Sequence, residues 1–476
     1  MKDFLTRPAW IEIDLDKFEN NMKIIKDKVG EKTEIMSVVK SDAYRLGALP
    51  LSQVSLNLGI NYYAVATLSE ALSLRRRFGG VNIFILGYTP RHLYEEAIKN
   101  QITLNIYSLG DARVLSEIAG ELNEKATIHI AFDSGMSRIG FTPCDEAKEE
   151  IKEIFKLENI NVEGIFSHFA ACESDPEFTE RQFRIFTSFI DELNNLGCTF
   201  KYRHIANSLS VLFHDEYGLD MVRPGIIQFG YTDSDHLPEE FGLEEIISLK
   251  AQISSIREVK KGESVGYERF HFCQKDTKVV TLPLGYADAF PRILSEKIEV
   301  LINGKRCKQI GLICMDQMMV DATDVDCKIG DDVVLIGRQG REEIKVRDIC
   351  IHSGDCETSF ITHFNRRLPK YYYKNKELVH VSKMDWQGYG FIAFFICKLT
   401  LKKRALGSLN LKILFFYYFF CFNFNNFSFI FFLVKLFLHR IIFFKYYIFK
   451  FFSRFSVNRM GNVSVFSIRK SSAWHC

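Results

Sequence analysis

Residues 34–44 read Glu-Ile-Met-Ser-Val-Val-Lys-Ser-Asp-Ala-Tyr, an apolar run that ends abruptly on a lysine. Its length and its β-branched residues predict a buried strand over Glu34–Val39. Lys40 then lies just beyond the carboxyl end of the strand, the edge where barrel enzymes carry their reactive groups. A lysine that loses hydration there has a lowered pKa and can serve as a Schiff-base nucleophile. Lysine is more commonly exposed, however, so a strand-end lysine can also be a plain surface residue.

Helix patterns flank this run on both sides. Apolar residues recur at helical spacing after Asp14, which we predict to be the N-cap of the first helix. Thr67-Leu-Ser-Glu70 has the form of a capping box and opens another helix. A long helix is predicted from about Glu177 to Leu196.

Strand patterns alternate with these helices, at residues 9–13, 82–86, 127–132 and 162–167. Such alternation predicts βαβ units around a parallel sheet. The pattern continues to about Tyr231, which is long enough for an eight-stranded barrel. We therefore predict an α/β fold whose N-terminal part, residues 8–240, is a (β/α)8 TIM-like barrel.

After about Leu249 the pattern changes to short strands that follow one another with glycine turns. Asn303-Gly304 between two of them is a strong hairpin signal. The predicted strands are Lys278–Leu282, Ile298–Ile302, Gln309–Ile313 and Asp332–Ile336. Residues 245–375 are therefore predicted to form a C-terminal, mostly-β domain.

The composition divides the chain once more. From Trp386 to Cys476 there is no Asp or Glu, but there are 13 Lys and Arg and 21 of the 43 Phe. The preceding residues carry 48 basic and 59 acidic side chains, so the net charge of +2 hides an acidic part and a basic tail. The overall composition excludes a wholly disordered, collagen-like or coiled-coil chain.

Residues 386–476, a low-complexity aromatic tail, admit two interpretations. Residues 413–434 lie between two lysines and are long enough to cross a bilayer, which would give membrane association. Asn423 and Asn425 oppose this, because polar side chains are costly in lipid. The tail is also rich in residues with AT-only codons, as in translated non-coding DNA after a frameshift or a lost stop codon. We expect this segment to be non-functional or artefactual.

The cysteines and the N-terminus indicate a reduced, cytoplasmic protein. The 12 cysteines are scattered without a C-x-x-C pair, which argues against a zinc ribbon or a disulfide framework. Met1–Trp10 has no apolar core of a signal peptide. We expect no metal site and no nucleic-acid partner.

Eight short motifs then follow in order. They are Lys40-x-x-x-Tyr44, His129-x-x-x-Asp133-Ser-Gly-Met136-x-Arg138, Ser167-His168-Phe169-Ala170, His204-x-Ala-Asn-Ser208, Val222-Arg-Pro-Gly225-Ile226, Val265-Gly-Tyr267, Gly285-Tyr-Ala-Asp288 and Cys314-Met-Asp-Gln317. The series resembles the alanine racemase family of fold type III enzymes, which depend on pyridoxal 5'-phosphate and combine a barrel with a β domain. The resemblance covers roughly residues 8–375.

The resemblance implies two catalytic bases. Lys40 would hold pyridoxal phosphate through a Schiff base and then act on one face of the substrate Cα. Tyr267 of the partner subunit would act on the other face, which implies a homodimer with shared active sites. Racemisation needs opposed acid and base groups, because the proton leaves one face and returns on the other.

The resemblance also implies the cofactor contacts. Arg223 would hydrogen-bond the pyridine nitrogen, and because arginine keeps its proton, that nitrogen would stay unprotonated. His168 would lie near the ring. The phosphate would be held by Tyr44, Ser208 and the backbone N–H groups of Gly225 and Ile226.

Arg138 would orient the substrate carboxylate, and Met315 and Asp316 would line the substrate entrance from the partner subunit. Each residue also has a simpler interpretation: an isolated tyrosine or histidine packs in a core, and an arginine before proline forms a loop salt bridge. The pattern departs from the family at Arg45, Ala131 and Thr358. Ala131 replaces a lysine that braces the arginine, and Thr358 replaces a tyrosine that contacts the phosphate.

The predicted function is therefore an isomerase that interconverts L-alanine and D-alanine and supplies D-alanine for peptidoglycan. One alternative is a racemase of serine or of several amino acids. Another is a degenerate protein that binds pyridoxal phosphate without turnover, because the three departures weaken the grip on the cofactor.

Overall fold

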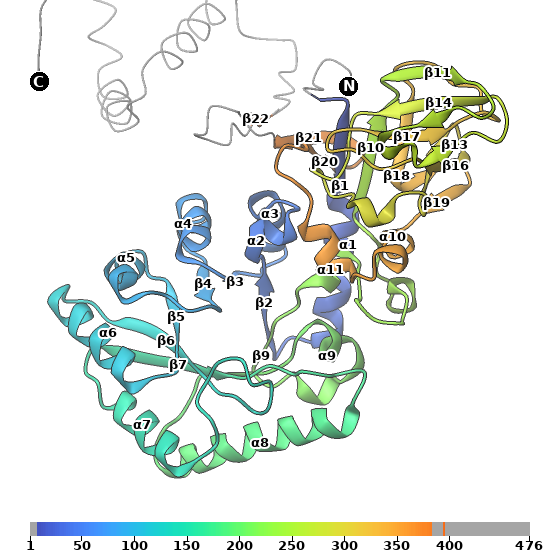
Figure 1. The fold of residues 1–476 in the computed structure, drawn as a ribbon. Coiled ribbons are helices and arrows are strands. Elements are labelled where there is room, and N and C mark those ends of the chain that lie inside the picture. The colour runs from blue at the N-terminus through green and yellow to red at the C-terminus, as the bar shows by residue number, and fades with distance from the viewer. Residues whose placement is uncertain (1–6, 383–393, 396–476) are drawn as a thin grey trace, which may run out of the picture. The chain divides into compact units, whose positions relative to one another are not determined.

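The computed structural model describes residues 7–382 and 394–395, and its first sheet contains eight parallel strands (Figure 1). Their order is β8-β7-β6-β5-β4-β3-β2-β9, so each strand except β9 lies beside its neighbour in sequence. The strands are β2 (Glu34–Val38), β3 (Tyr62–Val65), β4 (Asn82–Ile85), β5 (Thr103–Ile106), β6 (Ala126–Ala131), β7 (Ile160–Phe166), β8 (Tyr202–His204) and β9 (Met221–Val222).

Backbone hydrogen bonds bring the two edges of this sheet together. Asp220 N donates to Arg203 O at 3.2 Å, and Arg223 N donates to Ala206 O at 3.0 Å. The sheet is therefore a nearly closed barrel, which confirms the predicted TIM-like fold. Both faces of β3 and β5 are buried, as expected for parallel strands covered by helices.

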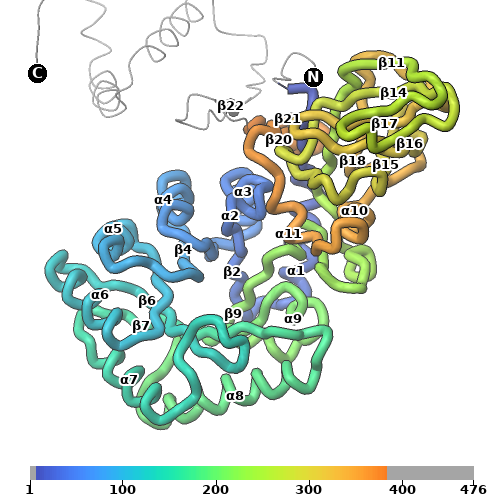
Figure 2. The backbone as a smooth tube through the Cα atoms, viewed as in Figure 1, coloured from blue at the N-terminus to red at the C-terminus, as the bar shows by residue number. Residues whose placement is uncertain are grey.

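Helices follow the barrel strands in the predicted alternation, and Figure 2 traces their path around the sheet. They are α1 (Leu15–Val29), α2 (Lys40–Tyr44), α3 (Ala48–Asn57), α4 (Leu68–Arg77), α5 (Tyr94–Lys99), α6 (Leu109–Glu121), α7 (Asp145–Phe155), α8 (Pro176–Asn195) and α9 (Ser208–Phe213), with 3-10 turns η2 (Arg91–Leu93), η3 (Asp215–Tyr217), η4 (Ile226–Phe229) and η5 (Pro238–Phe241).

Two helix starts were predicted from their caps. Asp14 Oδ1 accepts hydrogen bonds from Asp16 N and Lys17 N at 2.9 and 3.1 Å, so it is the N-cap of α1 as predicted. Thr67 Oγ1 accepts from Glu70 N at 3.4 Å and caps α4. The Glu70 carboxylate does not complete the capping box, because it accepts hydrogen bonds from other backbone groups described below.

The second large sheet is mostly antiparallel and confirms the predicted β-rich C-terminal part. Its order is β11-β14-β17-β16-β15-β18-β10-β1-β20-β21-β22, with β19 beside β18. Its strands are β1 (Ala9–Asp14), β10 (Ile247–Gln252), β11 (Ser255–Val259), β14 (Thr277–Leu282), β15 (Glu299–Ile302), β16 (Lys305–Ile310), β17 (Met318–Asp321), β18 (Asp332–Gln339), β19 (Glu342–Ile344), β20 (Lys370–Lys374), β21 (Glu377–Ser382) and β22 (Phe394–Phe395). β12 (Ser264–Val265) and β13 (His271–Phe272) pair with each other in a separate two-stranded sheet. The helices and 3-10 turns of this part are η6 (Tyr267–Arg269), η7 (Arg292–Leu294), α10 (Val346–Ser353) and α11 (Glu357–Thr362).

The N-terminal strand β1 belongs to this second sheet. It pairs antiparallel with β10 and parallel with β20, so the first described strand lies between two strands from the C-terminal part of the chain. The predicted turn Asn303-Gly304 joins the antiparallel pair β15 and β16. The strand predicted at Gln309–Ile313 is wrong in its limits, because β16 ends before Gly311, whose φ of +69° breaks the strand.

The predictions for the tail, including a membrane segment at 413–434, lie outside the described residues apart from β22. Among the residues that are described, none of the helices has both the length and the apolar character that a bilayer crossing requires.

Candidate active site

The chain turns sharply where β2 leaves the barrel. Lys40 begins α2, and Ser41 to Arg45 have φ values of 54, 58, 49, 55 and 69°. Five successive L-residues in the left-handed region cost about 1–2 kcal/mol each, so other contacts must hold this turn. It is called the lysine turn below. It lies at the carboxyl edge of the sheet, as expected for a barrel active site.

Carboxylates bind the backbone of the lysine turn. Glu70 accepts a hydrogen bond from Ser41 N at 2.8 Å with one oxygen and from Ala66 N at 2.9 Å with the other. Asp42 Oδ1 accepts from Ala48 N at 2.9 Å. The two carboxylates thus accept hydrogen bonds from backbone amides and stabilise the left-handed conformation of the lysine turn.

Burial lowers the pKa of the Lys40 ammonium, and the charges of Arg138 and Arg223 lower it further. Glu70 opposes this shift. A larger fraction of Lys40 is therefore neutral near pH 7 than for an exposed lysine. The neutral amine is the nucleophilic form, as the predicted Schiff base requires.

Tyr44, Ser208 and Gly225 form a narrow cradle. Gly225 N donates to Ser208 Oγ at 2.8 Å, and a Cβ at Gly225 would lie 2.5 Å from Tyr44 Oη. Burial, with a smaller effect of Asp233, raises the pKa of Tyr44, so its hydroxyl stays a donor. Ile226 begins η4, where the first amide has no partner within the helix. The cradle therefore offers the predicted phosphate the hydroxyls of Tyr44 and Ser208 and the amide of Ile226, whereas the Gly225 amide already donates to Ser208.

Arg223 is almost completely buried beside this cradle, with 3% of its surface exposed. Its Nη1 lies 2.7 Å from His204 Nδ1, and its Nη2 donates to Ser167 O at 2.6 Å. Burial and the charge of Arg138 lower its pKa to about 9, so it remains a cation at neutral pH. Nε and one Nη1 hydrogen have no acceptor among the described residues, which leaves a donor for a ring nitrogen.

A chain of buried histidines leads away from Arg223 across the barrel interior. His204 Nε2 lies 2.8 Å from His129 Nδ1, and His129 Nε2 lies 3.4 Å from Glu163 Oε2. Arginine can only donate, so His204 accepts at Nδ1 and donates at Nε2, and His129 repeats this orientation toward Glu163. Burial lowers the pKa of both histidines, which are therefore neutral. His204 can thus accept a hydrogen bond from Arg223 without placing a second positive charge beside it.

Glu163 closes this chain as an acceptor. Burial alone would raise its pKa, but hydrogen bonds from His129 and Tyr62 and the charge of Lys201 outweigh burial and lower it. Tyr62 donates to the same carboxylate at 3.0 Å. No role was predicted for Tyr62, His129 or Glu163, because strands far apart in the chain bring them together.

His168 and Arg138 complete the group at the barrel edge. Arg223 Nη2 lies 3.1 Å from His168 Nδ1, and burial together with Arg223, Arg138 and Lys40 lowers the pKa of His168 well below its ordinary value. Arg138 is exposed and makes no hydrogen bond or ion pair within residues 7–382. Ala131, which replaces the expected bracing lysine, is buried at the end of β6 and offers no polar contact. The charges of Arg138 and Arg223 both act on Lys40, where Glu70 opposes them. This set of cations favours an anionic ligand.

The remaining predicted residues lie in the second sheet region and not beside Lys40. Tyr267 begins η6 between β12 and β13, and 66% of its surface is exposed. Figure 1 shows β13 well separated from α2. Met315 is 52% exposed on the loop before β17, and Asp316 Oδ1 lies 2.6 Å from Arg367 Nη2. One chain therefore brings together the predicted cofactor residues, whereas Tyr267, the predicted second base, lies elsewhere on the surface.

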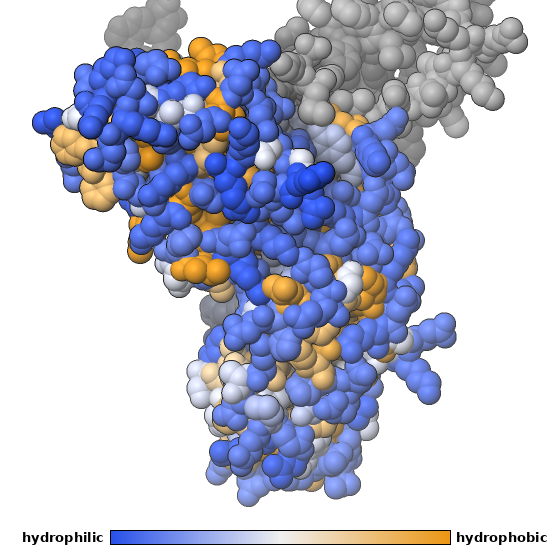
Figure 3. All heavy atoms as spheres, turned by 90° about the vertical axis from the view of Figure 1, so that its right-hand side faces the viewer, coloured by the Kyte–Doolittle hydropathy of each residue, from blue (hydrophilic) through white to orange (hydrophobic). Residues whose placement is uncertain are grey.

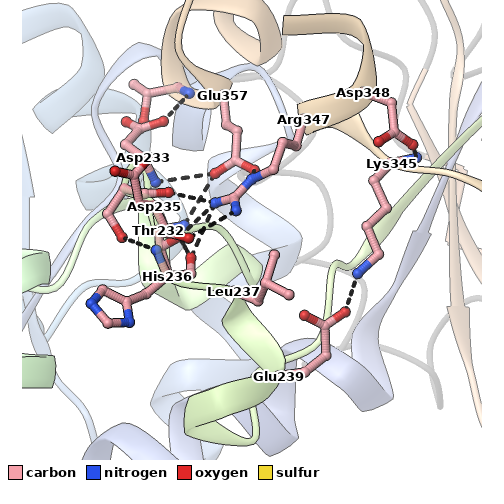
Figure 4. A network of polar contacts seen from close by, with 12 residues as sticks. Thr232, Asp233, Asp235, His236, Leu237, Glu239, Lys345, Arg347, Asp348 and Glu357 are labelled. Atoms are coloured by element: carbon pink, nitrogen blue, oxygen red, sulfur yellow. Dashed lines mark hydrogen bonds and ion pairs between the residues drawn. The ribbon is translucent and has the colours of Figure 1, made fainter. Parts of the chain in front are cut away.

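A polar network joins the loop after the barrel to α10 and α11 (Figure 4). Glu357 Oε2 accepts hydrogen bonds from Thr232 N and Asp233 N at 3.2 and 3.0 Å. Asp233 Oδ1 in turn accepts from Thr358 N at 2.8 Å. The backbone amide of Thr358 is therefore already engaged, and only its hydroxyl could add a phosphate contact.

Comparisons with known proteins agree with this arrangement. The family models "Alanine racemase, N-terminal domain" and "Alanine racemase, C-terminal domain" match residues 13–233 and 246–372. An alanine racemase of Clostridium perfringens (strain SM101 / Type A) is 40% identical over 382 residues, which cover 80% of this chain and 99% of that protein.

Solved structures give the same result. The alanine racemase of Clostridium difficile 630 has a TM-score of 0.76 at 37% identity, covering 80% of this chain and 99% of its own. A crystal structure of alanine racemase from Bacillus anthracis with bound L-Ala-P has a TM-score of 0.74 at 31% identity, covering 79% and 98%.

Proposed function

The chain belongs to the alanine racemase family, and on this premise we propose that Lys40 and the partner subunit's Tyr267 interconvert L-alanine and D-alanine. The enzyme is an isomerase that depends on pyridoxal 5'-phosphate, as its family does. When bound, this cofactor withdraws electrons from the substrate and so acidifies its Cα proton. The remaining tasks fall to side chains of the protein.

The observation that carries the proposal is the fit of the barrel edge to this cofactor. A lysine with a lowered pKa stands near the cradle, where a Cβ on Gly225 would lie 2.5 Å from the hydroxyl of Tyr44. Arg223 offers a donor from the same edge of the barrel. The three groups match the aldehyde, the phosphate and the ring nitrogen of one molecule.

Lys40 is proposed to accept the proton from one face of the substrate Cα while the partner subunit's Tyr267 donates a proton to the opposite face, and in the reverse direction the two exchange these roles. Its neutral fraction supports this role, because a base must be unprotonated before it acts. Arg223 is proposed to donate to the ring nitrogen and to leave it unprotonated, since the neutral His204 behind it holds the guanidinium but takes no proton from it. His168 would lie beside the ring.

Arg138 is proposed to bind the substrate carboxylate. Its exposed guanidinium is free of partners in the described part of the chain, and its fork matches a carboxylate. Without a brace at Ala131, this arginine must lose side-chain entropy when substrate binds. We therefore expect a higher KM for alanine than an enzyme with a bracing lysine at position 131 would have, with less effect on kcat.

The second base requires a second copy of the chain. Two apolar side chains that follow Tyr267 in the sequence are exposed, Phe270 at 55% and Phe272 at 44%, and Ile293 and Met315 of the same C-terminal part are exposed at 55% and 52%. Figure 3 shows hydrophobic side chains at the surface on this side of the molecule. Exposed apolar groups of this kind mark interaction surfaces. We propose a homodimer in which each Tyr267, with Met315 and Asp316, completes the site of the partner.

We further propose that the enzyme works in the cytoplasm and provides D-alanine for peptidoglycan. The cysteines within residues 7–382 are all unpaired, as in a reducing compartment.

The full-length chain with added pyridoxal phosphate tests the proposal. We expect the yellow absorbance of a lysine-linked cofactor, and interconversion of L- and D-alanine with kcat/KM well above that for serine. Colour without turnover of any amino acid would indicate a degenerate binding protein. Faster turnover of serine than of alanine would show that the enzyme is a serine racemase. A protein that stays colourless would contradict the proposal.

A further inference from the structure

Strand β20 of the second sheet contacts the lysine turn of the barrel through two side chains. Lys370 Nζ lies 3.6 Å from Asp42 Oδ2, and the Tyr372 hydroxyl donates to Leu46 O at 2.9 Å. Residues two apart on a strand face the same side, so one face of β20 reaches both ends of this segment. Neither contact could be anticipated from sequence, because more than 300 residues separate the partners.

Gly47 allows this close approach. Its φ is +102°, and a Cβ at this position would lie 2.0 Å from Tyr372 Oη. Glycine is thus required here both by the backbone conformation and by the tyrosine that packs against it. The segment and the strand are fitted to one another across the boundary between the two sheets.

Lys370 itself is buried, with 4% of its surface exposed. A buried ammonium needs a partner, because desolvation otherwise makes its charge very costly. The charged groups that act on it are Asp42, which favours the ammonium, and Arg45 and Arg366, which oppose it. Asp42 is therefore held by Lys370 on one oxygen and by Ala48 N on the other.

β20 is a firm support for these contacts. It pairs in parallel with β1 over Ile11–Asp14 and antiparallel with β21, so it is an interior strand of the sheet. Local hydrogen bonds alone leave the five left-handed residues at a high free energy. A second element that binds the turn from outside can keep it in place when Lys40 changes its bonding partner.

We propose that Lys370 and Tyr372 are positioning residues that clamp the lysine turn and thereby fix Lys40 and Tyr44 for the reaction. This inference rests on the proposed function for its catalytic consequence, but the clamp itself can be measured without cofactor. The C-terminal β part would then act within its own subunit through β20, in addition to supplying Tyr267 to the partner.

Hydrogen exchange of the full-length, cofactor-free protein tests the clamp. The variants Lys370→Met, Asp42→Asn and Tyr372→Phe remove the charge or the hydroxyl and retain most of the volume. The control is Lys374→Met, because Lys374 lies on the same strand and pairs with Asp16 at 3.1 Å, away from the turn. The clamp predicts at least about tenfold faster exchange of amides 41–48 in Lys370→Met, but unchanged exchange there in Lys374→Met.

The loaded enzyme gives the catalytic readout. We expect Lys370→Met to weaken pyridoxal phosphate binding and to lower kcat by about tenfold or more, while KM for alanine changes little. Lys370→Arg should restore both, since it returns the charge. Asp42→Asn should add little to Lys370→Met, because the two act as one pair.

Exchange at residues 41–48 that is the same in Lys370→Met, Tyr372→Phe and the wild type would overturn the clamp, whatever the activity. If Lys370→Met does not fold, Tyr372→Phe and Asp42→Asn decide by the same measurement. Absence of racemisation by the wild type would instead contradict the proposed function, and the exchange result would still stand.

Discussion

The lysine turn and the hairpin that carries Tyr267 differ in almost every physical respect. The turn is partly buried, strained and surrounded by charges that act on Lys40. The β12–β13 hairpin is short, and its tyrosine is 66% exposed. One chain thus preforms the part of the site that is proposed to hold the cofactor, whereas the proposed second base, Tyr267, is exposed at the surface. A protein with only the first half could bind cofactor, but it could not deliver a proton to the opposite face.

The largest expected effect is the loss of the preformed half. Lys40→Ala should abolish the yellow absorbance and reduce racemisation by about 10³-fold or more, as removal of a covalent catalyst commonly does. The measurement is an absorbance spectrum with an alanine racemisation assay. Lys99→Ala, a lysine in an exposed pair with Glu95, is the control and should leave both unchanged. Persistent colour in Lys40→Ala would show that another lysine binds the cofactor.

Loss of the displayed half should affect the reaction differently. Tyr267→Phe should retain the yellow absorbance and slow racemisation by about 10²- to 10⁴-fold in both directions, whereas proton abstraction by Lys40 from one enantiomer should persist. Exchange of the Cα hydrogen of L-alanine and of D-alanine in deuterated water measures this asymmetry. Tyr88→Phe changes another exposed tyrosine, 58% exposed, and serves as the control. Equal rates in both directions at wild-type level would remove Tyr267 from the mechanism.

The phosphate cradle is expected to show an intermediate effect. Gly225→Ala places a Cβ 2.5 Å from Tyr44 Oη, so the cradle must open. Pyridoxal phosphate binding to cofactor-free protein should weaken about 10- to 100-fold, with the loss of one or two hydrogen bonds to a charged group. Fluorescence titration measures this affinity. Gly79→Ala, where a Cβ meets nothing within 4 Å, should bind as the wild type does. Unchanged affinity in Gly225→Ala would place the phosphate elsewhere.

The smallest effect concerns the charges around Lys40. Arg138 lowers the pKa of Lys40 and Glu70 raises it. The rate of cofactor capture rises with pH as Lys40 loses its proton, so Arg138→Met should move this profile to higher pH and Glu70→Gln to lower pH. Shifts of up to about one pH unit are expected. Capture rates measured from pH 6 to 10 give the profiles, and shifts of the opposite sign would contradict the charge arrangement.

The sequence predicted several elements of the fold well because their signals are local. The strand before Lys40, the cap at Asp14 and the hairpin at Asn303 each depend on a few neighbouring residues. The left-handed lysine turn had no such signal, since Ser41 to Arg45 contain no glycine.

Contacts between distant parts of the chain were not predictable in this way. β1 pairs with strands more than 200 residues away, and its pattern says only that it is a strand. The series of side-chain contacts from Arg223 to Glu163 joins residues from three barrel strands and the loop after β9. Nothing in the sequence around Lys370 indicates that its side chain is buried against Asp42.

Mixing two inactive variants tests most directly whether the active site is shared between subunits. In a hybrid dimer of Lys40→Ala and Tyr267→Phe, one of the two sites regains both bases if each tyrosine serves the partner. An equal mixture, dissociated and reassociated, should recover about a quarter of wild-type activity, because half of the dimers are hybrids with one intact site. Activity no higher than that of the separate variants would contradict the shared site and place both bases within one chain.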